Sequence, residues 1–459
     1  MKKSLLFSSI LASSILLTGC IGGDSPANKY GDDDTGGGGS AAAVGIPTVV
    51  IRVTFDDFTS FENDAAWWNN LFFGNGGAMP DWDDPAIMNN KSVNGWFSTQ
   101  SQGTMGIQPV KESQGTANDG IIDFAFQDVH PDPSKAEIGN DARAVFDAAI
   151  PEIDQYIDFS QYDKNGDGEL TEDELQVVAV WANGEMATWG EGSAPAMWAH
   201  KWNAPNVGAQ TFDGVTGIAD TTNYFVMGEK HGTSTSPLPA TIGIIIHELG
   251  HSMFNLPDLY DTDGSSSGIG NWGMMGAGSW CISAAGEQAG STPCPYSFPT
   301  RVLLGIANYT EIDTTGNNGT FTLFPRGTEK ENGLILSTES STEFFMVEAS
   351  FNHQYDAGLF SLNNADPESG IQIWHFDGSV STNANDSQRI VDLEEASDKG
   401  MDSKSHRGKI ENLWTEGEDP FNDSNAVSNS KLNDGTATQV NINSFQLLQD
   451  GSWKIVWDN

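Results

Sequence analysis

The stretch "HELGHSMFNLPDLYD", residues 247–261, contains the side chains best suited to chemistry in this sequence. His247 and His251 stand four residues apart, and residues at that spacing lie on one face of an α-helix. Neutral imidazole is a zinc ligand, so the pair can hold a single ion. Glu248 can reach a water molecule on that ion without binding the ion itself. The pattern predicts metal-assisted hydrolysis of a peptide bond, in which Glu248 takes a proton from water and returns it to the departing amine.

The alternative is a helix that carries two histidines by chance, because the motif has only three fixed positions. We favour the metal site, since the motif follows the apolar run "TIGIII" and acidic residues come soon after it. Tyr260, a little further on, can stabilise the oxyanion of the reaction or simply pack.

A third metal ligand is expected just after the helix. Asn255 tolerates the left-handed backbone that ends helices, and Pro257 cannot continue one. The chain should therefore turn back and bring Asp258 toward the metal. Asp261 and Asp263 are the alternatives, and either can instead hold a structural calcium ion.

The elements around the motif point to a mixed fold. Residues 239–254 are predicted to form the helix, residues 46–55 and 175–182 to form strands, and residues 136–157 have helical spacing. Beyond about residue 311, short β-prone runs alternate with Gly, Asn, Asp and Ser, which predicts a β-sandwich-like domain. These runs are "TFTLF", "GLILST", "EFFMVEAS", "GIQIWHFD", "RIVDLEE" and "SWKIVW". One buried side of the predicted helix should consist of Ile244, Ile245, Leu249 and Met253.

The stretch "HELGHSMFNLPDLYDTDGSSSGIGNWGMMGAGSW" resembles the immune inhibitor A family of secreted bacterial zinc metallopeptidases, which are metzincin-like zincins. The resemblance implies zinc at His247 and His251, Asp258 as third ligand and Glu248 as general base. It also implies that "NWGMMGAGSW" is the Met-turn, with Met275 packed beneath the metal.

The resemblance has one departure and a wide extent. The family has glycine three residues after the second histidine and the aspartate three residues later. This chain has Phe254 at the glycine position and Asp258 one place late, so Asn255 would replace the glycine. The likeness also includes "VVIRVTFDD", "MWAHKW" and the β-rich runs, and covers roughly residues 47–459.

Residues 163–174, "DKNGDGELTEDE", match the twelve positions of an EF-hand calcium loop. Gly168 provides the sharp turn, and the following segment looks like a strand, so a structural ion is expected rather than a sensor. An acidic surface turn is the alternative. The predicted calcium ligands are Asp163, Asn165, Asp167, the Glu169 carbonyl, Thr171 and Glu174.

Composition excludes several partners. Acidic residues outnumber basic ones 63 to 21, for a formal net charge of −42. A chain with this charge should repel nucleic acids and anionic lipid, and its carboxylates suit calcium. We therefore expect protein or peptide substrates, no nucleic acid, and membrane contact only through a lipid anchor.

The first residues predict export. Residues 1–20, "MKKSLLFSSILASSILLTGC", have a cationic start and a short apolar run, as secretory signals do. The ending "LTGC" resembles a lipobox, which implies lipid attachment at Cys20; an ordinary signal peptide is the alternative. Residues 21–46 are rich in Gly, Ser, Ala and Asp and are predicted to form a flexible linker. The expected location is the cell envelope, in the outer membrane, or the medium.

After Cys20 only two cysteines remain, Cys281 and Cys294. In an exported chain such a pair is expected to form a disulfide.

The full prediction is an α+β protein with a metzincin-like zincin catalytic domain at residues 47–310 and a β-rich C-terminal domain at residues 311–459. Its predicted function is zinc-dependent endopeptidase cleavage of extracellular proteins, with zinc and calcium as cofactors. The alternatives are a surface adhesion protein on a zincin scaffold and a calcium-dependent carbohydrate binder. Cleavage specificity, activation and oligomeric state stay open.

Overall fold

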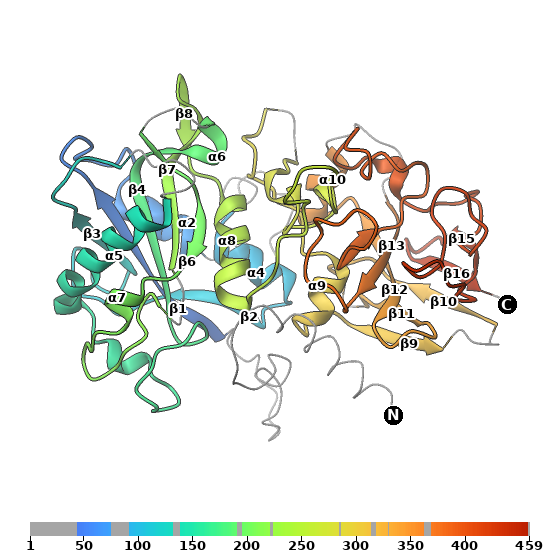
Figure 1. The fold of residues 1–459 in the computed structure, drawn as a ribbon, viewed down its shortest axis with the longest axis horizontal. Coiled ribbons are helices and arrows are strands. Elements are labelled where there is room, and N and C mark those ends of the chain that lie inside the picture. The colour runs from blue at the N-terminus through green and yellow to red at the C-terminus, as the bar shows by residue number, and fades with distance from the viewer. Residues whose placement is uncertain are drawn as a thin grey trace.

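The computed structural model describes residues 44–74, 91–131, 138–190, 195–220, 224–283, 286–313, 318–328, 330–361 and 369–457. These residues form two lobes that lie side by side, with helix α8 (Ile242–Phe254) near the boundary between them (Figure 1). We call residues 44–308 the N-terminal lobe and residues 309–457 the C-terminal lobe. The predicted signal sequence, Cys20 and nearly all of the predicted linker lie outside the described residues.

The N-terminal lobe is built on one eight-stranded sheet with the order β2-β1-β4-β7-β6 and three further strands paired beside this path. β1 runs parallel to β2, β3 and β4, and β4 runs parallel to β7, whereas β6 and β8 are antiparallel to β7. All of β4 is buried, which is typical of a strand with both faces of its sheet covered. The strands predicted at residues 46–55 and 175–182 are confirmed. The strands are β1 (Val44–Thr54), β2 (Met105–Pro109), β3 (Ile121–Ala125), β4 (Gln176–Glu185), β5 (Ala196–Met197), β6 (His200–Trp202), β7 (Tyr224–Thr233) and β8 (Ser236–Pro239).

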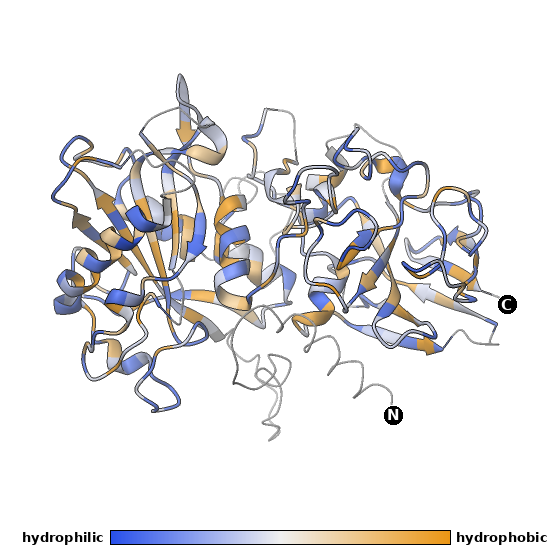
Figure 2. Cartoon of the chain, viewed as in Figure 1, coloured by the Kyte–Doolittle hydropathy of each residue, from blue (hydrophilic) through white to orange (hydrophobic). Residues whose placement is uncertain are grey.

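Helices cover both faces of this sheet. Helix α5 (Ile138–Ile153) packs on one face, where Val49, Ile51 and Trp181 share its hydrophobic cluster. Helices α2 (Ala65–Phe73), α4 (Val93–Gln100) and α8 belong to the cluster on the other face. Figure 2 shows apolar residues concentrated in the central strands, with polar residues on the surrounding loops. Shorter helices are α6 (Met186–Trp189), α7 (Pro205–Gly208), α9 (Phe298–Leu303) and α10 (Ala357–Ser361).

Helix α8 carries both histidines of the motif. It begins at Ile242, three residues later than predicted, because Ser236–Pro239 forms β8. It ends as expected at Asn255, whose φ of 51° and ψ of 35° are left-handed. The prediction of one buried side is too narrow, since the helix is buried almost all round. Glycine makes this possible: a Cβ at Gly243 would lie 1.9 Å from the Ser279 carbonyl oxygen.

The C-terminal lobe contains a five-stranded sheet and a three-stranded sheet. The first has the order β14-β13-β12-β11-β9 and the second the order β10-β16-β15. One hydrophobic cluster contains residues of both sheets, among them Phe345, Ile373 and Trp453. All the β-prone runs predicted in this region are strands, whereas β9 and β15 were not singled out. The strands are β9 (Tyr309–Asp313), β10 (Gly319–Leu323), β11 (Gly333–Ser337), β12 (Glu343–Phe351), β13 (Ser369–Asp377), β14 (Val391–Leu393), β15 (Ile442–Leu447) and β16 (Trp453–Trp457).

The two lobes share one core. The cluster that contains α8 continues through Met275 into Trp374 and Phe376 on β13. Strand β9 begins at Tyr309, and the division expected from the sequence lies between residues 310 and 311. Among the described residues, no helix combines the length and apolar character that a membrane crossing needs.

Candidate metal centre

Three side-chain atoms converge at the end of α8. Asp258 Oδ1 lies 3.1 Å from His247 Nε2 and 3.1 Å from His251 Nε2, and the two nitrogens are 3.2 Å apart. Ligand atoms around tetrahedral zinc, with metal–ligand bonds of about 2.0–2.1 Å, are about 3.3 Å from one another. The three atoms therefore have the spacing of ligands to one zinc ion.

The opposite nitrogen of each imidazole faces a backbone carbonyl. His247 Nδ1 is 3.1 Å from the Met274 oxygen, and His251 Nδ1 is 2.6 Å from the Leu256 oxygen. A carbonyl can only accept, so each Nδ1 carries a hydrogen, and whenever the ring is neutral its lone pair is on Nε2 and faces Asp258. Three acceptors this close repel one another unless a cation lies between them. The arrangement fits a divalent metal bound by two imidazoles and a carboxylate.

The pocket favours positive charge. A proton on Nε2 can take the place of the cation: burial by itself would lower the pKa of His247, but Asp258 and Glu248 outweigh it and raise that pKa to about 9. Burial likewise opposes the charge on Asp258, yet hydrogen bonds from His247 and His251 hold its pKa well below the usual range. These shifts describe a site that stabilises a cation.

The turn after α8 brings Asp258 to this position. The Leu256 N–H donates to the Gly250 carbonyl over 3.2 Å, which closes the helix end. Three residues later the Leu259 N–H donates to the Met275 carbonyl over 2.8 Å. The other expected candidates lie apart from the two histidines, and the carboxylate of Asp261 accepts hydrogen bonds from its own loop, including the Asp263 N–H.

Met275 lies against the inner face of α8. It is buried, and a Cβ at Gly250 would come within 2.8 Å of its sulfur. Gly250 therefore allows the methionine to pack directly beneath the turn between His247 and His251.

Glu248 and Tyr260 complete the surroundings. Burial raises the pKa of Glu248, against the attraction of both histidines, and its carboxylate accepts the backbone N–H of Lys201 on edge strand β6. The Tyr260 ring is stacked on His247 with centroids 6.2 Å apart, and its hydroxyl bonds to Asp258. Tyr260 is 39% exposed, so it faces both the metal ligands and solvent. From the sequence, Tyr260 could equally have been a residue that only packs, and the residue type could not show that it lies beside Asp258.

A second group with possible metal ligands among the described residues contains Glu395, Asp398 and His406. Here the Gly408 N–H donates to His406 Nδ1 over 3.1 Å, so the hydrogen of the neutral ring is on Nε2, 3.0 Å from Asp398. Lys409 also forms an ion pair with Asp398, and burial raises the pKa of Glu395 to about 8. Asp398 is thus already paired with a ring N–H and with the Lys409 ammonium, whereas Asp258 is paired with the two imidazoles.

The predicted calcium loop has a compact backbone. Asp163 accepts the N–H groups of Gly166 and Gly168, and Glu174 accepts those of Lys164 and Thr171. The loop leads into β4 rather than a helix, as expected. Among the described residues, its carboxylates are not one of the groups whose oxygens lie within 4.8 Å of one another.

Cys281 and Cys294 correct a prediction. Both are buried free thiols, not a disulfide. Burial and the neighbouring Cys281 thiol raise the pKa of Cys294 well above its usual value. The Cys294 N–H donates to the Gly278 carbonyl over 2.9 Å, and backbone contacts of this kind hold the two residues together without a covalent bond.

Residues 54–299 match the catalytic domain of the immune inhibitor A peptidase M6 family. The matched region covers more than half of the chain and contains every residue of the candidate metal centre. The chain belongs to the immune inhibitor A peptidase family. It therefore carries the catalytic domain of a metalloendopeptidase.

One relative of this family is immune inhibitor A of Bacillus thuringiensis subsp. alesti, which is 28% identical over 263 residues. The alignment covers 53% of this chain and 36% of that protein, so it spans about a third of the relative's length. Residues 300–459 lie outside the family match.

Proposed function

We propose that this protein is a zinc-dependent endopeptidase that cleaves peptide bonds of extracellular proteins. The observation that carries the proposal is the convergence of His247 Nε2, His251 Nε2 and Asp258 Oδ1 within 3.2 Å. Both imidazole tautomers are set by backbone carbonyls, which leaves three acceptors for one cation. The family match supports hydrolysis over the adhesion and carbohydrate-binding alternatives, which nothing else favours.

Zinc held by His247, His251 and Asp258 would supply Lewis acidity, which polarises a peptide carbonyl and lowers the pKa of water. Glu248 accepts the proton of the water molecule as the water oxygen bonds to the carbonyl carbon. It then delivers that proton to the amine nitrogen as the carbon–nitrogen bond breaks. The Lys201 N–H orients the Glu248 carboxylate for both transfers. The Tyr260 hydroxyl, which is bonded to Asp258 in this structure, would turn its single hydrogen to the developing oxyanion.

Casein hydrolysis by the purified protein tests this proposal. A chelator should abolish the activity and added zinc should restore it. Activity that survives complete metal removal would contradict the proposal, as would a protein that binds zinc through His247 but cleaves none of a diverse peptide library.

We also propose one structural calcium ion in the loop at residues 163–174. Its support is the sequence match and the hydrogen bonds by which Asp163 and Glu174 hold the loop backbone. Binding would draw the carboxylates of Asp163, Asp167 and Glu174 closer together than they are in this structure.

We propose a metzincin-like arrangement for the N-terminal lobe. For the C-terminal lobe we propose a β-sandwich-like arrangement, because one hydrophobic cluster joins the two sheets of that lobe.

We propose export with a lipid anchor at Cys20, based on the signal-like residues 1–20. Cys20→Ala should then release the protein from membranes into the soluble fraction. Membrane association that is unchanged by this substitution would rule out the anchor.

A further inference from the structure

The segment between Asp258 and Met275 is bonded along its length by the C-terminal lobe. Ser267 donates its N–H to the Met401 carbonyl and its hydroxyl to the His406 carbonyl, each over 2.9 Å. The Asn271 N–H donates to the Arg407 carbonyl over 2.6 Å. This segment therefore depends for its shape on residues more than 120 positions later in the chain.

Asn383 makes the contact closest to the metal centre. It lies between β13 and β14 in a stretch whose neighbours, such as Thr382, are exposed, yet Asn383 itself is fully buried. Its amide group donates to the Leu259 carbonyl over 2.8 Å and to the Val391 carbonyl over 2.7 Å, and it accepts the Val391 N–H over 3.2 Å. Leu259 directly follows Asp258, so this amide bonds the residue next to the third ligand.

The Leu259 peptide is held from both lobes. Its N–H donates to the Met275 carbonyl, and its own carbonyl accepts from Asn383 and from the Ile269 N–H. An apolar crevice under this peptide is also lined from both lobes, by Leu256, Leu259, Met275, Phe376, Ile390 and Val391. A shift of the C-terminal lobe here would move Asp258 relative to the two histidines.

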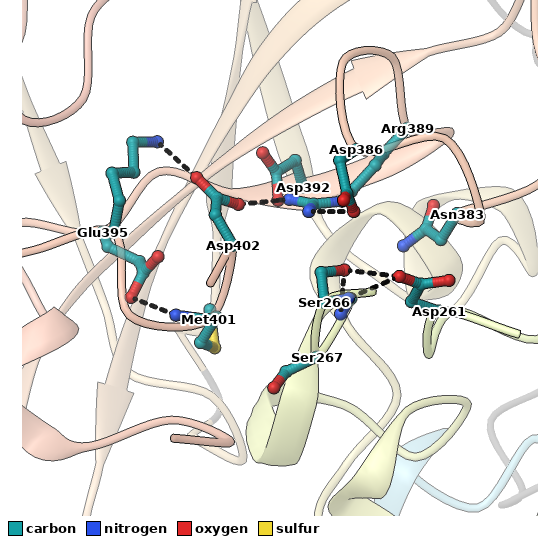
Figure 3. Close-up of polar contacts among 12 residues, drawn as sticks. Asp261, Ser266, Ser267, Asn383, Asp386, Arg389, Asp392, Glu395, Met401 and Asp402 are labelled. Atoms are coloured by element: carbon teal, nitrogen blue, oxygen red, sulfur yellow. Dashed lines mark hydrogen bonds and ion pairs between the residues drawn. The ribbon is translucent and has the colours of Figure 1, made fainter. Parts of the chain in front are cut away.

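The segment that carries Asn383 is itself fixed by Arg389. The buried guanidinium of Arg389 pairs with Asp386, Asp392 and Asp402 (Figure 3). Figure 3 also labels Asn383 and Asp261, which belong to the two segments that Asn383 joins through the Leu259 carbonyl. Ser265 bonds Asp386 across this junction over 2.8 Å, so a rigid C-terminal element lies against the ligand-bearing segment.

We propose that Asn383 is a positioning residue of the metal centre and that the C-terminal lobe is part of its scaffold. The proposal rests on zinc binding by His247, His251 and Asp258, as proposed above. Asn383 touches no ligand atom. It holds the backbone of Leu259 in place. Because Asp258 is the preceding residue, this contact also keeps the Asp258 carboxylate at equal distance from both imidazoles. Zinc affinity thus becomes a property of both lobes.

Asn383→Ala tests the proposal through zinc affinity, measured by competition with a calibrated chelator on the full chain. Substituting groups that orient metal ligands typically costs about tenfold to a hundredfold in affinity, and we expect at least tenfold here. Peptidase activity should fall at limiting zinc and recover at high zinc. Zinc affinity within threefold of the unsubstituted protein would overturn the proposal.

Asn332→Ala is the matched control. Asn332 also bonds two backbone groups with its amide, the Phe324 N–H and the Thr322 carbonyl, but it lies within the C-terminal lobe and touches no part of residues 258–275. Its substitution should lower thermal stability without changing zinc affinity. If both variants lose zinc affinity equally, the effect is general destabilisation and the proposal fails.

Hydrogen exchange on the unsubstituted protein provides a test that does not need Asn383→Ala to fold. Removing zinc should accelerate exchange in residues 256–275 and also in residues 383–393, because coupling between two sites is reciprocal. Faster exchange confined to residues 256–275 would overturn the proposal. A protein that binds no zinc through His247 would instead refute the proposed function itself, so the two failures are distinct.

Discussion

The described part of the chain holds two clusters of possible metal ligands, namely His247, His251 and Asp258 in the N-terminal lobe and Glu395, Asp398 and His406 in the C-terminal lobe. They differ in the backbone group that bonds to Nδ1 of each imidazole. Backbone carbonyls accept from Nδ1 of both histidines in the first cluster, whereas a backbone N–H donates to Nδ1 of His406 in the second. One arrangement aims lone pairs at a common point, and the other aims an N–H at a carboxylate.

This difference shows that residue types alone do not make a metal site. The groups that set the imidazole tautomer decide whether a histidine can bind a metal or only donate a hydrogen bond. Charge acts in the same direction, because Lys409 already neutralises Asp398, whereas among the described residues Asp258 is paired with the two histidines and with no Lys or Arg. The following experiments test the contrast in order of expected effect.

Removing one histidine from each cluster should give the largest difference. His247→Ala should lose bound zinc and reduce peptidase activity by at least about 10⁴-fold, because a ligand is gone and catalysis depends on the ion. His406→Ala should keep a full equivalent of zinc and most of the activity, because the group that bonds Ser267 is the backbone carbonyl of residue 406, which alanine retains. Metal analysis and casein assays of both variants check this. Zinc loss from His406→Ala alone would reverse our assignment of the two clusters.

The carboxylic acids near each cluster should also differ. Glu248→Gln should retain zinc but lower kcat by about 10²–10⁴-fold, the range typical of a lost general base. Glu395→Gln should change kcat little, because that buried side chain contacts the Met401 N–H, the Asn412 amide and His406 and none of the proposed zinc ligands. Steady-state kinetics of zinc-loaded variants separates the two. Full activity in Glu248→Gln would remove it from the mechanism.

His375 extends the comparison to a histidine with carboxylates on both sides. Its Nε2 lies 3.1 Å from Glu343 and its Nδ1 lies 3.6 Å from Glu394. Burial opposes the charge, but the two carboxylates raise the pKa of His375 to about 9. A raised folded-state pKa stabilises the fold below the unfolded value of about 6.5, and this stabilisation is lost as pH rises through about 9.

The contribution of His375 is on the order of 3 kcal/mol. Denaturant unfolding at pH 6 and pH 9.5 should show the unsubstituted protein losing more stability than His375→Gln over this interval. Equal losses in the two proteins would mean that His375 is not charged in the folded state.

The proposed calcium loop should give the smallest effect. Calcium at a hundred times its dissociation constant should stabilise the protein by about 2.7 kcal/mol, and Glu174→Gln should remove most of this gain. Thermal unfolding with and without calcium measures it. If calcium leaves the melting temperature of the unsubstituted protein unchanged, the loop is an acidic turn without an ion.

Features set by local chain properties could be predicted from the sequence. Asn255 was expected in the left-handed region because of its residue type, and the apolar β-branched runs in β1 and β4 identified buried strands. The spacing of His247 and His251 placed both on one helix face. These inferences need only the conformational preferences of residues that are close together in the sequence.

Features that depend on distant contacts could not be predicted. Nothing near Asn383 or Lys201 indicates that they bond to the surroundings of Asp258 and Glu248, because the partners meet only in the folded chain. Strand β15 has polar and apolar residues without a clear alternation, so its β-character comes from pairing with β16. The sequence did not predict the nearly complete burial of α8, because the spacing of apolar residues does not show where neighbouring segments approach the glycines of the helix.

Anomalous diffraction at the zinc edge, from crystals grown with one equivalent of zinc, tests the central claim most directly. We predict a single strong peak about 2.0–2.2 Å from His247 Nε2, His251 Nε2 and a carboxylate oxygen of Asp258. A peak between Glu395 and His406, or no peak at the end of α8, would contradict the account.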